Sequence, residues 1–160
     1  VRALGDDGFN VCSLDVPFVL GQIEGLEVPH IAALAEYARG NIPGLPLFAP
    51  KGGTNHISSH SLAQASLHAL ERGESGRAYL VGDENLSWKA YLELWCEAVG
   101  NPQDLEVRED DHPMFPNVIM FAGAGATVSY EPDAADLALL DYDRGQIGPL
   151  IRRIAAGRWQ

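Results

Sequence analysis

Short apolar runs alternate with stretches of helical periodicity along this chain. Residues 9–14 are mostly apolar and lie between Gly8 and Pro17, which predicts a short strand covered on both faces. A second apolar run covers residues 77–81, and a shorter strand is expected at 105–108. Because these strand patterns alternate with helical ones, the sequence predicts an α/β fold with a parallel sheet.

The clearest helix covers residues 88–99. Five apolar side chains recur there at helical spacing and share one face: Trp88, Tyr91, Leu92, Trp95 and Val99. Ser87 can cap the N-terminus of this helix, and Gly100 is suited to its end. Both tryptophans are therefore expected in the core rather than stacked on a ligand.

Three further helices are predicted from the same kind of periodicity, over residues 30–39, 61–72 and 147–156. Ser61 followed by Gln64 forms a capping-box pattern at the start of the second of them. Residues 41–53 contain three prolines and three glycines, which predicts a loop before that helix.

Composition and charge narrow the possible partners. The 160 residues are 46% hydrophobic, which suits one domain with a core of ordinary size. The net charge of −11 argues against a nucleic acid or an anionic membrane as partner. No apolar run approaches the ~20 residues that span a bilayer. Cys12 and Cys96 lie in apolar contexts without a CxxC pattern, so we expect buried reduced thiols and a cytoplasmic protein.

Polar side chains near the middle of the chain are candidates for a binding site. They include Asn55, His56 and His60, of which the two histidines are four residues apart and could meet on one helical turn. A metal needs more ligands than these, and the serines at 58–59 are poor ones, so no metal site is predicted and surface or capping roles are favoured for these side chains. Residues 110–112 form a second polar cluster, which we interpret as an acidic loop.

The order of these pieces resembles the extended short-chain dehydrogenase/reductase family, of the NAD-dependent epimerase/dehydratase type. Residues 16–21, Val-Pro-Phe-Val-Leu-Gly, are similar to the Arg-Pro-x-x-Val-Tyr-Gly-Pro segment of that family. Leu-Ala-Gln-Ala at 62–65 and Tyr-Leu-Val-Gly at 79–82 add to the likeness. The chain departs from the family pattern at Val16, at Gln22 and in the Ser-Ser-His-Ser of residues 58–61.

The resemblance implies the C-terminal half of a Rossmann-like enzyme. This half would contain the last parallel strands of the sheet and a small mixed substrate-binding subdomain. We expect a single domain over residues 1–160, in which 1–22 and 60–82 form the sheet core. Residues 23–59 and 83–160 would then form the subdomain on the substrate side.

The same resemblance implies candidate site residues. Pro17, Phe18 and Val19 would face the nicotinamide of the cofactor, although a strand end packed into the core is the alternative from the residues alone. Five residues are candidates for contact with the substrate: Gln22, Ile23, Glu24, Asn55 and His56.

Two functional motifs of the family, one that binds the cofactor and one that is catalytic, are missing from this sequence. A glycine-rich turn must lead into a helix to hold the dinucleotide pyrophosphate, and residues 123–128 are not followed by a helical pattern. The Tyr-x-x-x-Lys pair is also missing, since Lys51 and Lys89 are the only lysines and neither follows a tyrosine by four residues. No catalytic residue is therefore assigned to this chain. The chain begins at Val1 without Met, and the resemblance implies that the pair lies just upstream.

The predicted function is the C-terminal substrate-binding half of an NAD(P)-dependent oxidoreductase or epimerase/dehydratase. The parent protein would use NAD or NADP, and the isolated chain is expected to bind neither cofactor and to be inactive. Its expected partners are a small-molecule substrate and either an N-terminal nucleotide-binding half or a second copy of itself. The alternative is a stand-alone, non-catalytic binding or interaction module derived from the same fold.

Overall fold

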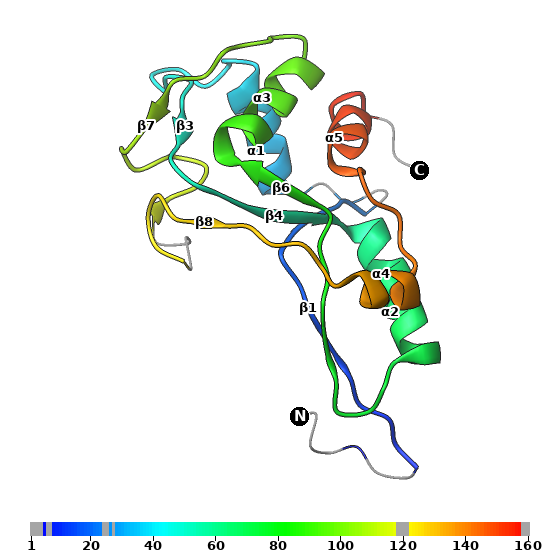
Figure 1. The fold of residues 1–160 in the computed structure, drawn as a ribbon. Helices are drawn as coiled ribbons and strands as arrows, with labels where there is room; N and C mark the ends of the chain where they lie inside the picture. The colour runs from blue at the N-terminus through cyan, green and yellow to red at the C-terminus, as the bar shows by residue number, and fades with distance from the viewer. Residues whose placement is uncertain (1–4, 6–7, 24–25, 27, 118–121, 158–160) are drawn as a thin grey trace. The chain divides into compact units, whose positions relative to one another are not determined.

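The computed structural model describes residues 5, 8–23, 26, 28–117 and 122–157 (Figure 1). Contacts between residues divide the chain into two compact units. The first unit consists of Val1–Gly21, Asn55–Glu84 and Tyr130–Ile147. The second unit consists of Gln22–Thr54, Asn85–Ser129 and Gly148–Gln160. Each unit is thus assembled from three separate stretches of the chain.

Parallel strand pairs form the centre of the first unit. Strand β1 (Ser13–Asp15) pairs in parallel with β5 (Ala78–Leu80), so that Leu14 lies opposite Tyr79. Strand β2 (Phe18–Leu20) pairs in parallel with β4 (Gly53–Ser58), with Phe18 opposite His56. The predicted parallel α/β arrangement is confirmed, although β1 occupies only the end of the predicted run.

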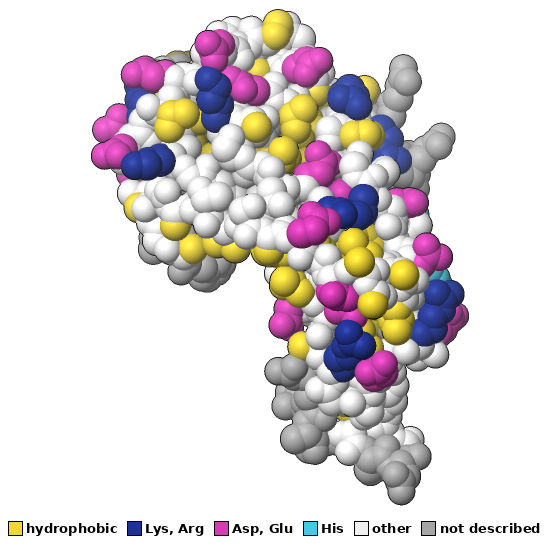
Figure 2. Space-filling view, in the orientation of Figure 1, with side chains coloured by type: hydrophobic (Ala, Val, Ile, Leu, Met, Phe, Trp, Pro, Cys, Tyr) yellow, Lys and Arg dark blue, Asp and Glu magenta, His cyan; other side chains and the backbone are white. Residues whose placement is uncertain are grey.

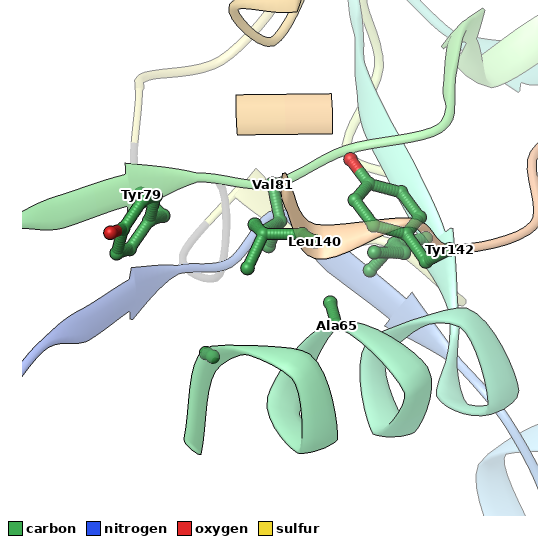
Figure 3. Close-up of a cluster of buried hydrophobic side chains, with 7 residues drawn as sticks. Ala65, Tyr79, Val81, Leu140 and Tyr142 are labelled. Carbon is green, nitrogen blue, oxygen red and sulfur yellow. The ribbon is translucent and has the colours of Figure 1, made fainter. Parts of the chain in front are cut away.

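Helices α2 (Ser59–Arg72) and α4 (Ala134–Leu140) belong to the first unit with these strands. They pack together around a cluster of buried hydrophobic side chains: Ile57, Ala65, Ala69, Tyr79, Val81, Leu140 and Tyr142. Figure 3 shows Ala65 of α2 directed toward Leu140 and Val81. The cluster therefore joins α2, the strands and the segment around α4 in one core.

The start of α2 corrects two expectations. The cap is Ser58, whose side chain accepts a hydrogen bond from the backbone N–H of Ser61 at 2.9 Å. Strand β4 runs directly into the helix, so the helix begins earlier than the predicted cap at Ser61, which lies buried in the first turn. His56 and His60 do not share a helical turn, because His56 belongs to β4 and His60 to α2, and the surface or capping role expected for His56 is wrong because its side chain is fully buried.

In the second unit, α1 (Pro29–Ala38) and α3 (Trp88–Ala98) pack against each other. The prediction for α3 is confirmed, since Ser87 accepts a hydrogen bond from the N–H of Ala90 at 3.1 Å and both Trp88 and Trp95 are buried. Trp88 stacks on Phe115 with ring centroids 4.8 Å apart. An aromatic core thus holds this unit together.

Short strands complete the second unit. Strand β3 (Ala49–Pro50) pairs in parallel with β7 (Val107–Arg108), within the strand predicted at 105–108. Strand β8 (Thr127–Val128) pairs in parallel with the first two residues of β4. Strand β6 (Glu84–Ser87) leads into α3, and α5 (Ile147–Ala155) confirms the terminal helix. The predicted loop at 41–53 is interrupted by β3 and ends where β4 begins.

The surface reflects the acidic composition. Figure 2 shows acidic side chains spread over the visible face, with basic side chains beside many of them. Ion pairs such as Lys51 with Glu109, at 3.2 Å, account for part of this pattern. Cys96 is buried and Cys12 is half-buried, and neither forms a disulfide within the described residues. Among those residues no helix has the length and hydrophobicity needed to cross a membrane.

Candidate functional site

The predicted cofactor-facing residues follow the C-terminal end of β1 and lead into β2. Pro17 and Phe18 are half-buried, and the Val19 side chain is 41% exposed. The ring of Phe18 lies 5.2 Å from that of His56, which fixes Phe18 against β4. In open α/β sheets, ligands bind outside the C-terminal ends of the strands. The contact of Pro17, Phe18 and Val19 with a nicotinamide stays a prediction.

Gly21 ends this segment at a close approach to α2. A Cβ at Gly21 would lie 2.2 Å from the Ser59 Oγ, so any side chain there would push the strand end away from the helix. The glycine therefore lets the segment after β2 lie directly against the start of α2. This close approach holds the predicted cofactor-facing residues in place.

Asn55 and His56 are fully buried in β4. The Asn55 Oδ1 atom accepts a hydrogen bond from the N–H of Asp83 at 3.1 Å, and the same N–H lies 2.9 Å from the backbone oxygen of His56. The side-chain amide of Asn55 also donates to the Tyr130 backbone oxygen, at 3.4 Å. These bonds tie β4 to the segment that follows β5. Substrate contact by Asn55 or His56 stays a prediction.

Gly82, directly after β5, is enclosed by polar groups. The Tyr142 hydroxyl donates to the Gly82 oxygen at 2.8 Å and accepts from its N–H at 3.1 Å. The Tyr130 hydroxyl donates to the Val81 oxygen at 2.8 Å, and burial raises the pKa of Tyr130 to about 12. A Cβ at Gly82 would lie 2.4 Å from the Asn55 Oδ1. Both tyrosines thus remain neutral hydrogen-bonding groups at this strand end.

The Asp83 carboxylate is a buried anchor that the sequence analysis missed. It accepts hydrogen bonds from the backbone N–H groups of Gly145 at 2.6 Å and Gln146 at 2.9 Å. Arg144 donates to the Asp83 backbone oxygen at 2.7 Å and pairs with Glu131. The hydrogen bond that Arg144 donates to the Glu131 carboxylate is the main reason that the Arg144 pKa is raised. Asp83 therefore fixes the loop after α4 to the end of β5.

Gln22 lies in the second unit, beside a groove of about 420 Å³. Val28 and residues of α1 and α5 line this groove, and its apolar residues are Val28, Ile31, Ala32, Ala35, Ile154 and Ala155. The amide nitrogen of Gln22 lies 3.5 Å from the Leu26 oxygen. Ile23 is 66% exposed, and Glu24 lies outside the described residues. The groove is mainly apolar, with the polar groups of Gln22, Glu36 and Arg39 at its edges.

A second cavity of about 270 Å³ lies among β3, β7 and the loops that follow them. Its basic residues are Lys51 and Arg108, and both are paired: Lys51 with Glu109 at 3.2 Å, and Arg108 with Glu106 at 2.6 Å. Asp110 lines the same cavity. The charges in this cavity are therefore largely balanced within the protein.

Residues 110–112 lie in a loop with exposed aspartates, as predicted, but the side chain of His112 in this loop is buried. The Nε2 of His112 donates to the Phe48 oxygen at 3.0 Å, and its Nδ1 accepts from the N–H groups of Met114 and Phe115. A carbonyl can only accept and an N–H can only donate, so these partners fix the neutral tautomer. Burial lowers the His112 pKa, which also favours the neutral form. His112 is a structural residue of the second unit.

Residues 123–128 do not have the geometry of a dinucleotide-binding turn. Gly123 and Gly125 adopt positive φ angles of 95° and 72°. The chain then enters β8 and not a helix. A pyrophosphate site of the Rossmann type needs the N-terminus of a helix directly after the glycine turn. The described residues also contain no group of three or more His, Cys, Asp or Glu side chains that could hold a metal ion.

No family model matches this chain, and no curated protein matches it. Solved structures do. UDP-N-acetylglucosamine 4-epimerase from Bacillus cereus matches 94% of this chain with a TM-score of 0.65 and 17% identity, over 49% of the epimerase chain. RMD from Pseudomonas aeruginosa, complexed with NADPH, matches 94% of this chain with a TM-score of 0.61 and 16% identity, over 48% of its own chain.

UDP-glucose 4-epimerase from Bifidobacterium longum, in complex with NAD+ and UDP, matches 96% of this chain with a TM-score of 0.61 and 14% identity, over 50% of its own chain. The chain therefore spans about half the length of these solved structures. The predicted fold is confirmed: the chain has the α/β fold of the C-terminal half of a Rossmann-like epimerase structure. At these identities the likeness shows the fold alone.

Proposed function

We propose that residues 1–160 are the substrate-side, C-terminal half of an NAD(P)-dependent oxidoreductase or epimerase/dehydratase. The observation that carries this proposal is the match that covers 94% of this chain but 49% of an epimerase chain. Structures of this group are described with NADPH or with NAD+ and UDP, so a dinucleotide and a small-molecule substrate are the proposed ligands. The other half of the fold would hold the dinucleotide pyrophosphate, because residues 123–128 do not fit it.

Pro17, Phe18 and Val19 would line the nicotinamide side of the complete site. The support for this is their position, since they follow the C-terminal end of β1 and β5 ends at the same edge of its parallel sheet. Val19 is the most accessible of the three residues, and the contacts of Phe18 and Gly21 fix its backbone. A nicotinamide bound there would supply hydride transfer, and these residues would orient its ring.

Gln22, Ile23 and Glu24 would contact the substrate in this proposal. Two of these residues are described, and they offer a polar amide and an exposed apolar side chain directly after the cofactor-facing segment. Asn55 and His56 are the other two residues proposed for the substrate, and we assign them a positioning role because both are fully buried and accept a hydrogen bond from the Asp83 N–H. The substrate would be a small molecule.

Binding of NADH or NADPH, followed by fluorescence, tests the proposal. The polypeptide that contains these residues in its native cell should bind one of the two cofactors, and recombinant residues 1–160 should bind neither. Val19→Glu in that polypeptide should weaken binding by about tenfold or more, which corresponds to about 1.4 kcal/mol. Leu70→Glu is the matched control, because Leu70 is 82% exposed on α2, away from this strand end.

Two results would contradict the proposal. One is NAD(P)-dependent dehydrogenase activity of residues 1–160 alone, which would require catalytic machinery within this chain. The other is a native polypeptide of 17.3 kDa that binds neither cofactor, which would favour a stand-alone binding module.

A further inference from the structure

The groove between α1 and α5 has the size of a small-molecule site. Its volume is about 420 Å³, and ligand pockets in proteins occupy about 300–1,000 Å³. Its described lining residues all belong to the second unit. Small side chains form much of its wall, namely Ala32 and Ala35 on α1 and Ala155 on α5. Larger side chains at these positions would fill the space, so the groove depends on their small size.

The charges at the edge of this groove balance each other. Arg39 donates to the Glu36 carboxylate at 2.5 Å, and Asn41 donates to the same carboxylate at 2.8 Å. The bond from Asn41 and then that from Arg39 lower the pKa of Glu36, so the carboxylate stays ionised beside the guanidinium. The other described lining residues are uncharged, and Arg152 and Arg153 of α5 are not among them. Within the described lining, the only cation therefore already has an anionic partner.

Gln22 adds a polar group to this apolar groove. Its amide nitrogen lies 3.5 Å from the Leu26 oxygen, a contact that suits the nitrogen because a carbonyl can only accept. The amide oxygen, Oε1, is buried and accepts no hydrogen bond from the described residues. A buried acceptor without a donor is unfavourable, so this oxygen would gain from a ligand that brings one. A turn of the Gln22 side chain would present it to a donor in the groove.

We infer that this groove binds the substrate, and that the substrate is an uncharged, mainly apolar small molecule with one hydrogen-bond donor, such as a hydroxyl group. Its apolar body would lie between α1 and α5, and its donor would pair with the Gln22 Oε1. A UDP-sugar does not suit this groove, because the charge of its pyrophosphate would meet a cation that is already neutralised. The inference rests on the proposed function and names the class of its substrate.

Two matched fluorescent probes test this assignment on the native polypeptide. N-phenyl-1-naphthylamine is uncharged and has one N–H donor, and 8-anilinonaphthalene-1-sulfonate has the same apolar body with a negative charge. We expect the neutral probe to bind at least about tenfold more tightly, because the groove offers no unpaired cation to the sulfonate. UDP should not displace the neutral probe.

Substitutions on α1 show whether the probe lies in this groove. Ala32→Phe should fill the groove and weaken binding of the neutral probe by about tenfold or more. Ala33→Phe is the matched control, because Ala33 is the next residue of the same helix and does not line the groove. It should leave binding of the probe unchanged. Circular dichroism shows whether both variants are folded.

Gln22→Met tests the hydrogen bond separately, with a side chain of similar length that is a poor acceptor. In 1-benzylnaphthalene a CH2 group replaces the N–H of the neutral probe, and its affinity is measured by displacement of that probe. We expect the preference for the N–H compound to be severalfold larger in the wild type than in Gln22→Met. This comparison also serves if Ala32→Phe does not fold.

Displacement of the neutral probe by UDP, equal binding of the two fluorescent probes, or unchanged binding in a folded Ala32→Phe would each overturn the inference. An equal preference for the N–H compound in the wild type and Gln22→Met would overturn the role of Gln22. A polypeptide that meets these expectations but binds neither NADH nor NADPH would support the groove and contradict the proposed function. A polypeptide that binds either cofactor but fails the probe tests would contradict only the substrate class.

Discussion

Asp83 shows how one buried carboxylate can hold two distant segments together. Its side chain is 1% exposed and accepts two backbone hydrogen bonds from the loop after α4. Buried polar groups are costly when they lose their partners, more so when the group is charged. At the residue scale, Asp83 therefore holds the loop after α4 at the end of β5, in addition to the hydrogen bonds that Tyr130 and Tyr142 make there.

Asp83→Asn should destabilise the protein by about 2 kcal/mol, because an amide cannot accept both backbone hydrogen bonds as a carboxylate does. Urea unfolding followed by circular dichroism measures the change. Asp110→Asn, at an exposed position, should stay within about 0.5 kcal/mol of the wild type. If Asp83→Asn lowers the free energy of unfolding no more than Asp110→Asn does, other contacts hold the loop after α4.

His112 should make stability depend on pH. Burial lowers its pKa in the folded state, so the unfolded chain binds more protons as the pH falls below the ordinary histidine value. The stability that neutral His112 provides is therefore complete above that value and is lost as the pH falls through the folded pKa. Urea midpoints at pH 7.5 and 5.5 should differ more in the wild type than in His112→Gln.

The exposed residue His60 supplies the control for this experiment. His60→Gln is the matched histidine-to-glutamine replacement, because the side chain of His60 is 68% exposed. The carboxylates are the same in the wild type, His112→Gln and His60→Gln. The difference between the proteins in how the urea midpoint changes with pH therefore reports on His112. An identical change of the urea midpoint with pH in the wild type and His112→Gln would show that His112 is not the source of this pH dependence.

The elements differ in how far their sequence reveals them. Helix α3 could be predicted because a continuous apolar face, a serine cap and a terminal glycine all agree. Strand β4 was missed because Asn55 and His56 are polar but fully buried, and their hydrogen-bond partners lie far along the sequence. Burial of such residues follows from tertiary contacts, which no local pattern contains.

Helix α4 was missed for a different reason. It is only seven residues long, so its apolar residues do not complete two turns of periodicity. A local signal did exist, since the Asp133 side chain accepts hydrogen bonds from Ala135 and Asp136 N–H. An N-cap aspartate directly before an alanine-rich segment would have identified this helix. The candidate site was predicted less well than the fold, because Asp83 and the tyrosines around Gly82 act through long-range contacts.

The N-cap of α3 allows a prediction at the element scale. Ser87→Ala should cost about 1 kcal/mol, because the N–H of Ala90 loses its side-chain acceptor. Thermal or urea unfolding measures this loss. Ser129→Ala at an exposed position outside any helix should have little effect. A Ser87→Ala protein as stable as the control would mean that water replaces the cap without loss.

At the scale of the whole molecule, each of the two units has a buried core among its described residues. Leu140 is 1% exposed in the cluster of the first unit, and the stacked pair of Trp88 and Phe115 lies in the second. Each unit has its own buried cluster, so each is expected to open locally with its own free energy.

Leu140→Ala should therefore act mainly on the first unit. It should cost about 2–5 kcal/mol, as expected for a large-to-small core substitution, and should lower amide protection in α2 and β5. Protection in α3 should fall much less. Hydrogen exchange followed by mass spectrometry compares these segments, and an equal loss of protection in α2 and α3 would show that the molecule opens as one cooperative body.

The interleaving of the two units has a consequence for synthesis. The first unit receives its last stretch, Tyr130–Ile147, only after most of the second unit has left the ribosome. The second unit in turn receives its last stretch at the very end of this sequence. Domains made of one continuous stretch can fold in order from the N-terminus during translation. Here the first core cannot close until Leu140 and Tyr142 have been made, so the apolar residues of its earlier stretches stay unpaired while most of the second unit is synthesised.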